Sequence, residues 1–160
     1  MANAMQRRLN YPRAIATFVS AYVVVTILGI ALSVAISILK HTPQTIEPMD
    51  NQAYLLSERF LPWLNLVVWA IFAWVYFRSR RHNDSPTLRE EAFALGAFWL
   101  TAAVMVDYVG FVLIRNPISL SPHDFYIGQF PWIYLIYVAV LIAPLCWLKL
   151  ANSVQGKTTD

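Results

Sequence analysis

The sequence predicts an all-α integral membrane protein in which four transmembrane helices pack as an antiparallel bundle. The first observation is composition: 58% of the 160 residues are hydrophobic and only 13% are charged, whereas a soluble domain has about 25% charged residues. The second is a set of four apolar runs, each near the length of a membrane-spanning helix. The third is that basic residues occupy alternate connections between these runs. A chain this short cannot bury so much apolar surface in its own core, so the surplus must face lipid.

The four runs are expected to form helices because backbone groups in lipid must hydrogen-bond within their own segment. Their bounds are about Ala14–Leu39, Phe60–Phe77, Ala92–Ile114 and Trp132–Leu148. The first run is too long for the apolar part of a secretory signal peptide, and no small-residue cleavage motif follows it, so we expect a retained helix. The chain is expected to form one domain, with flexible ends at residues 1–10 and 152–160.

The placement of basic residues predicts the orientation of the helices. Nine of the twelve Lys and Arg residues precede the first run, lie between the second and third, or follow the fourth. Such residues concentrate on the cytoplasmic side of a membrane. The sequence therefore predicts a multi-pass protein of the cell membrane, surrounded by the lipid bilayer, with both termini in the cytoplasm. The basic residues are not interleaved with exposed aromatic residues, so no nucleic-acid partner is expected.

The connections before and after the third run both contain helix-start signals. Ser85 and Pro86 give one ahead of the third run. In the second outer loop, Ser121 suits a helix cap, a proline follows, and Asp124 places an acid in the first turn. We expect a short helix here on the membrane surface, with Phe125 or Tyr126 turned towards lipid.

The same outer loop contains polar side chains that are candidates for ligand contact, namely Arg115, His123 and Asp124. Together with His41, two of them would suit a metal ion, but no ligand-spacing motif is present and no metal site is expected. The single cysteine excludes an intramolecular disulfide. No cofactor is expected either.

Asp107 is the one acidic residue inside an apolar run. It lies about 10 Å below the outer end of the third helix at 1.5 Å per residue. Counting inward from the outer ends of the other helices reaches Ser33, Asn65 and Tyr137 at similar depth, with Tyr134 one turn outward. Polar groups must face the inside of a bundle, because exposure to lipid is costly. We therefore expect a polar layer, or the floor of an outward-facing pocket, in which Asp107 lies within reach of at least one of the first three residues.

The first helix contains small residues at intervals of four, Gly29, Ser33 and Ser37. Such a stripe permits close approach of another helix. It suits packing within the bundle, which is the simpler interpretation, or a contact in a homodimer or with another membrane protein.

The segment from Asp107 to Pro144 carries a recognisable pattern, "DYVGFVLIRNP", then "FYIGQFPWIYLIY", then "AP". This pattern resembles uncharacterised small four-helix integral membrane proteins of bacteria. The resemblance covers the second half of the chain, implies a bacterial cell membrane and brings no activity with it. The four-helix multidrug exporters are a looser analogy, because their membrane carboxylate lies in the first helix and the first helix here has none.

No nucleophile–base pair, metal motif or phosphate-binding loop is visible, so no catalytic residue and no reaction is assigned. The first hypothesis is a non-enzymatic membrane protein that binds a small ligand, a lipid or a protein partner through the outward-facing pocket. The alternative is a small proton- or cation-coupled transporter with Asp107 as the coupling site. Because four helices are few for a complete pathway, transport would favour a dimer.

Overall fold

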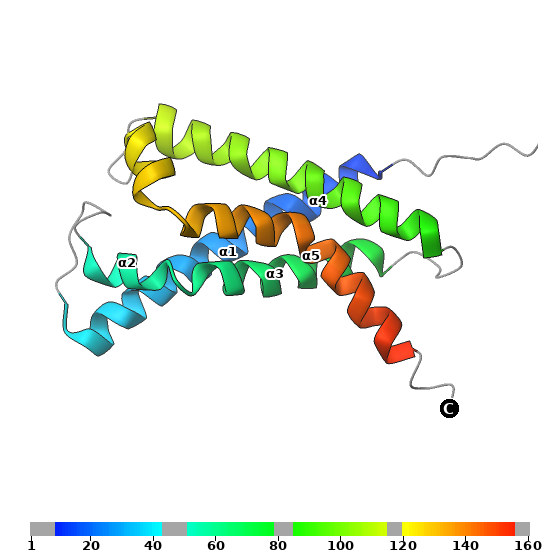
Figure 1. Ribbon diagram of the computed structural model, residues 1–160, viewed down its shortest axis with the longest axis horizontal. Coiled ribbons are helices and arrows are strands. Elements are labelled where there is room, and N and C mark those ends of the chain that lie inside the picture. Colours follow the sequence, from blue (N-terminus) through cyan, green and yellow to red (C-terminus); the bar gives the residue numbers. More distant parts are fainter. Residues whose placement is uncertain (1–8, 43–50, 79–84, 115–119, 156–160) are drawn as a thin grey trace, which may run out of the picture.

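The computed structural model describes residues 9–42, 51–78, 85–114 and 120–155, and every regular element in these ranges is helical (Figure 1). The elements are α1 (Tyr11–Lys40), α2 (Gln52–Ser57), α3 (Leu61–Phe77), α4 (Ser85–Asp107), η2 (Tyr108–Leu113), η3 (Asp124–Gly128) and α5 (Trp132–Gln155). Three stretches, in α1, in α4 with η2, and in α5, are long and apolar enough to cross a membrane. α3 is apolar but shorter. The predicted all-α class is confirmed, and the three long apolar helices indicate a membrane protein.

α1 has capping groups at both ends. Asn10 accepts a hydrogen bond from the Arg13 amide at 3.2 Å, as side-chain caps do. At the other end His41 adopts a left-handed conformation with φ 52°, and the Thr42 amide donates to the Ser37 carbonyl at 3.2 Å. Such a turn satisfies carbonyls that the helix itself leaves open. α1 therefore extends slightly beyond the predicted run at each end.

α2 was not predicted. Asn51 accepts a hydrogen bond from the Tyr54 amide at 3.1 Å and starts this short helix. α2 packs against α1, and α3 begins soon after it with Pro62 in its first turn. The described part of the connection between α1 and α3, residues 51–60, therefore packs against α1 through α2.

α4 begins at Ser85, well before the apolar run that starts at Ala92. The helix-start signal of Ser85 and Pro86 thus predicts its beginning better than the hydrophobicity does. At Asp107 the α-helical turns give way to the wider turns of the π-helix η2. Wider turns of this kind are frequent at functional sites.

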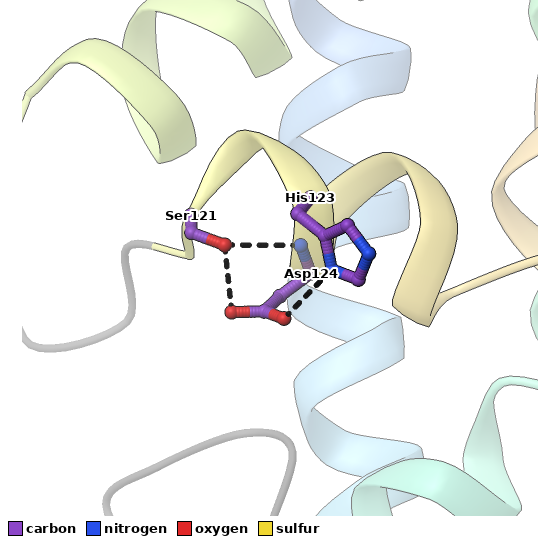
Figure 2. A network of polar contacts seen from close by, with 3 residues as sticks. All are labelled: Ser121, His123 and Asp124. Carbon is purple, nitrogen blue, oxygen red and sulfur yellow. Dashed lines mark hydrogen bonds and ion pairs between the residues drawn. The ribbon is translucent and has the colours of Figure 1, made fainter.

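The short helix expected after Ser121 is present as η3, preceded by helical residues 122 and 123. Ser121 caps it: the Ser121 hydroxyl accepts from the Asp124 amide at 3.1 Å and donates to the Asp124 carboxylate at 2.7 Å (Figure 2). The hydrogen bond from Ser121 holds the pKa of the Asp124 carboxyl below its usual value. Of the two rings of which one was expected to turn towards lipid, Phe125 is 5% exposed and packs against Ile133 and Tyr137 instead. Tyr126 is partly buried beside it.

α5 packs extensively against α3 and α4, and α1 packs mainly against α3 (Figure 1). The centre of the molecule is aromatic: Trp69 and Trp99 are both 1% exposed or less, with ring centroids 5.1 Å apart. α5 bends in its second half (Figure 1) and contains Pro144, which removes one backbone hydrogen bond of the helix. α5 also continues to Gln155, so residues 152–155 are helical where flexibility was expected. At the N-terminal end, residues 9 and 10 are described and Asn10 caps α1, whereas residues 1–8 and 156–160 lie outside the described residues.

The small-residue stripe of α1 faces the inside of the molecule. A Cβ atom on Gly29 would lie 3.4 Å from the Leu61 side chain of α3. Ser37 is buried and donates to the Thr42 carbonyl at 2.7 Å. These contacts support the internal interpretation of the stripe. Other α1 side chains, such as Ile27 and Ile30, are about 60% exposed and present an apolar surface.

Candidate functional site

Asp107 lies at the junction of α4 and η2 and points into the molecule. Its side chain is only 9% exposed. The Tyr22 hydroxyl of α1 donates to one carboxylate oxygen, and the Tyr137 hydroxyl of α5 donates to the other at 2.9 Å. Asp107 is therefore held by two phenols from two different helices. Tyr137 was an expected partner, and this expectation is confirmed.

Tyr22 was not predicted as a partner of Asp107. Sequence reasoning compared the depths of backbone positions and selected Ser33 on the same helix. A tyrosine hydroxyl lies far from its own backbone, so it reaches a polar layer at another depth. Ser33 is close to the same region and lines the cavity described below, but the structure gives it no hydrogen bond to Asp107.

Asn65 was also expected near Asp107, and its hydrogen bonds correct that expectation. The Asn65 amide nitrogen donates to the Leu61 carbonyl at 2.9 Å. Its side-chain oxygen accepts from the Trp69 indole at 3.0 Å. Asn65 is therefore satisfied within α3, where one helical turn separates it from each partner. It contributes to the wall of the cavity without binding the acid.

A cavity of about 440 Å³ adjoins Asp107. Its walls come from α1, α3, α4 and α5, with α2, η2 and η3 contributing at one end of the molecule (Figure 1). The gap follows from the packing, since α1 contacts α3 and α2 but has little contact with α4. Most of the lining is apolar, including Trp69, Phe111, Phe125 and Trp132. A cavity of a few hundred Å³ with apolar walls and a few polar groups is typical of a small-molecule site.

Glu58 is the second carboxyl group in the cavity lining, and sequence reasoning missed it. It follows α2 directly and is only 5% exposed. Its Oε1 atom is buried and has no hydrogen-bond partner among the described residues. The described lining residues include no Lys, Arg or His. The cavity is therefore acidic on one side and apolar on the others.

One hydrogen bond joins α2 to the segment that follows η3, and another lies within α2. The Gln129 amide, just after η3, donates to the Tyr54 hydroxyl at 2.7 Å. The Ser57 hydroxyl donates to the Tyr54 carbonyl at 2.7 Å. Burial raises the pKa of Tyr54, so this phenol remains a neutral hydrogen-bonding group. One end of the cavity is thus lined by two segments that are far apart in the sequence, α2 and the residues around Gln129.

Burial raises the pKa of Glu58 to about 7 from a usual 4.5, and the neighbouring Tyr54 hydroxyl offsets only part of this rise. The folded state therefore holds the Glu58 proton more strongly than the unfolded state does. Its contribution to stability is complete below about pH 4.5 and is lost as the pH rises through about 7. We expect the free energy of unfolding in detergent to fall by about 1–2 kcal/mol between these values, less than the full pKa difference implies because protein interiors screen a charge more than a dry apolar medium does.

The measurement is chemical unfolding as a function of pH for the unaltered protein and for Glu58→Gln. The variant has no carboxyl group to titrate at this position, so its stability should depend less on pH. Glu90→Gln, at an exposed position on α4, is the matched control and should leave the pH dependence unchanged. An equal slope in the unaltered protein and Glu58→Gln would contradict the burial argument.

The remaining candidates lie apart from the cavity. The His123 side chain is 76% exposed, and its Nδ1 atom lies 3.5 Å from Asp124 on the surface (Figure 2). Tyr134 is 43% exposed and does not line the cavity. Arg115 lies outside the described residues. Among the residues that the structure describes, no three side chains of the types that bind metals converge, so the alternative with His41, His123 and Asp124 gains no support.

A second polar cluster lies on α1, α3 and α4. The Tyr76 hydroxyl accepts from the Asn10 amide at 3.1 Å and donates to Glu91 at 2.8 Å. The Arg13 guanidinium donates to the Val75 carbonyl at 2.6 Å and lies over the Tyr76 ring. These groups satisfy one another where the N-terminal end of α1 meets α3 and α4, and none of them lines the cavity beside Asp107.

The arrangement around Asp107 and Glu58 can bind a compact molecule with an apolar body and a polar group. Comparison with other proteins adds nothing to this geometry: no protein-family profile, curated protein or solved structure matches the chain.

Proposed function

We propose that the protein crosses a cell membrane four times as an antiparallel bundle, with α3 as the fourth span and both termini in the cytoplasm. α3 is uncharged over Leu61–Phe77 and packs beside α1 and α5. Its 17 residues give about 25 Å of helix, and lipid accommodates a short span by local thinning. An even number of spans also keeps the nine basic residues on one side. In this arrangement the end of the cavity that α2 and η3 line faces the outer surface, and η3 lies at the interface.

The topology is tested with reporter fusions after Lys157 and within the connection from Gln44 to Asn51. We expect a cytoplasmic signal from the first fusion and an external signal from the second, because Lys and Arg are retained on the cytoplasmic side. Active alkaline phosphatase and inactive green fluorescent protein at position 157 would rule out the four-span arrangement.

We propose further that the protein is a non-enzymatic membrane protein that binds a small ligand in the cavity beside Asp107. The observation that carries this proposal is the 440 Å³ space between the helices, with aromatic walls and converging polar side chains. Binding sites of this form orient a ligand with few polar contacts while its apolar part fills the remaining volume. Asp107 provides one such contact, because Tyr22 of α1 and Tyr137 of α5 hold it in a fixed position.

The binding proposal is tested by filling the cavity. Ser33 lines it and Ile27 does not, so Ser33→Trp should obstruct the space, while Ile27→Trp places the same indole ring on an exposed face. The probes are biphenylbutylamine, biphenylbutanol and biphenylbutyric acid, which share one body and differ in the polar group. We expect at least one probe to bind the unaltered protein and the Ile27→Trp control, and to bind Ser33→Trp at least about tenfold more weakly, since every 1.4 kcal/mol of binding free energy is tenfold. Binding that Ser33→Trp leaves unchanged, or no binding of any probe, would contradict the proposal.

Proton- or cation-coupled transport by a dimer is the second candidate function. The observation that favours it is that Asp107 connects α1 and α5 through Tyr22 and Tyr137, so that a change in the charge of Asp107 acts on two helices at once. Intramembrane carboxylates are recurrent proton and cation sites. The exposed apolar face of α1 is available for contact with a second copy. A pH-dependent flux in proteoliposomes that Asp107→Asn abolishes would support transport over simple binding.

A further inference from the structure

The cavity contains a buried acceptor that the protein itself does not use. Glu58 lines the space and is only 5% exposed. Its Oε1 atom has no hydrogen-bond partner in the described part of the chain. A buried polar atom without a partner costs about 1–3 kcal/mol. Most such atoms in folded proteins have a partner, and exceptions call for an explanation. A donor group on a bound molecule would remove this cost.

The charge of the lining determines which donors are favoured. Glu58 and Asp107 are the charged residues among the described lining residues, and both are acids. An anionic ligand would be repelled by an ionised carboxylate here, and a neutral ligand would gain no charge attraction. A cationic group would gain attraction to both acids, and in surroundings of low polarity such attraction is stronger than in water.

The walls determine the rest of the ligand. Trp69, Phe111, Phe125 and Trp132 present aromatic rings to the space, and Ile133 and Val140 add aliphatic surface. Aromatic faces also attract cations. The volume of about 440 Å³ exceeds what a metal ion or a simple ammonium ion needs, so most of the ligand must be apolar.

We propose that the cavity binds a protonated primary or secondary amine with an apolar body, the ammonium group donating a hydrogen bond to Glu58 Oε1 while the body packs against the aromatic walls. Asp107 is the second acidic group of the lining, and its carboxyl oxygens accept hydrogen bonds from Tyr22 and Tyr137. A quaternary ammonium group lacks N–H donors and is a poorer match for Glu58. This inference rests on the proposed ligand-binding function and specifies the chemical class of the ligand.

The test compares the three biphenyl probes on the full chain in an uncharged detergent by isothermal titration calorimetry. At about pH 8 the amine is cationic, the alcohol is neutral and the acid is anionic. We expect the amine to bind at least tenfold more tightly than the alcohol, and the acid to bind most weakly. Glu58→Gln should weaken the amine at least tenfold and leave the alcohol within about twofold, whereas Glu90→Gln should leave both unchanged.

The alcohol serves as the measure of an intact cavity in each variant. If Glu58→Gln no longer bound the alcohol, the second variant is Glu58→Asp, which retains the charge. Glu58→Asp should again bind the amine more tightly than the alcohol, and its failure to do so would overturn the inference. If the alcohol or the acid bound the unaltered protein as tightly as the amine, and Ser33→Trp still abolished that binding, the choice of an amine would be wrong while the ligand-binding function stood. If none of the three probes bound, both proposals would fail.

Discussion

Gly96→Ala should lower the free energy of unfolding by about 3 kcal/mol, because it places a methyl group where α4 and α5 touch. A Cβ atom on Gly96 would lie 2.2 Å from the carbonyl oxygen of Leu141 and 3.1 Å from its carbonyl carbon. These are backbone atoms of the opposite helix, so no side-chain rotation can relieve the contact. α4 and α5 would have to separate, and the buried packing of Leu95, Trp99 and Val140 would loosen with them.

The matched control for this change is Gly110→Ala. Nothing lies within 4 Å of a Cβ atom built on Gly110, so its effect should stay within about 0.5 kcal/mol. Unfolding of both variants in mixed micelles, followed by circular dichroism, measures the difference. A Gly96→Ala variant as stable as the unaltered protein would mean that α4 and α5 are further apart than the structure places them.

Apolar runs and capping residues were sufficient to predict α1, α3, α4, α5 and the short helix after Ser121 from the sequence, but not α2. The run from Phe60 to Phe77 and the start at Trp132 differ little from the observed α3 and α5, because span length and charge fix such segments. Ser121 was correctly expected to begin a short helix, because its side chain and Asp124 form a local hydrogen-bond pattern. Local signals of this type do not depend on the rest of the fold.

The parts that sequence reasoning missed depend on contacts between distant segments. The burial of Glu58 follows from α2 folding over the end of α1, held through Tyr54 and Gln129. An acidic residue in a polar connection gives no sign of this, although Asn51 at the start of α2 is a typical cap residue. The close approach at Gly96 depends likewise on where α5 crosses α4. Composition and periodicity carry no information about such crossings.

For Asp107, the sequence predicted the direction of the side chain correctly but only one of its two hydrogen-bond partners. Its inward direction was predicted from the high cost of a carboxylate facing lipid. Tyr137 was predicted as a partner from its depth along the fourth apolar run. The choice among the other polar residues required knowledge of side-chain reach. Tyr22 reaches the acid across the gap where α1 and α4 are poorly packed, while Asn65 is held within its own helix by Leu61 and Trp69.

Asp107→Leu should therefore destabilise the fold by about 2–5 kcal/mol, since it leaves the buried hydroxyls of Tyr22 and Tyr137 without their acceptor. Asp107→Asn keeps the shape and an acceptor oxygen, so its loss should stay near 1 kcal/mol. Unfolding in detergent gives both values. A charge-specific role predicts in addition that Asp107→Asn folds but loses the pH dependence of binding or flux.

A double-mutant cycle separates the hydrogen bond between Tyr137 and Asp107 from the other effects of placing the larger apolar leucine at position 107. Tyr137→Phe alone should cost about 1 kcal/mol, because it removes the 2.9 Å bond to Asp107. In the Asp107→Leu background the same change should be neutral or stabilising, because the tyrosine hydroxyl then has no acceptor to lose and its removal leaves one fewer unsatisfied donor. Equal costs in the two backgrounds would show that the two side chains are not coupled. The assignment of Tyr137 as a partner that holds Asp107 in the polar layer would then have to be abandoned, and Tyr22 alone would account for the buried carboxylate.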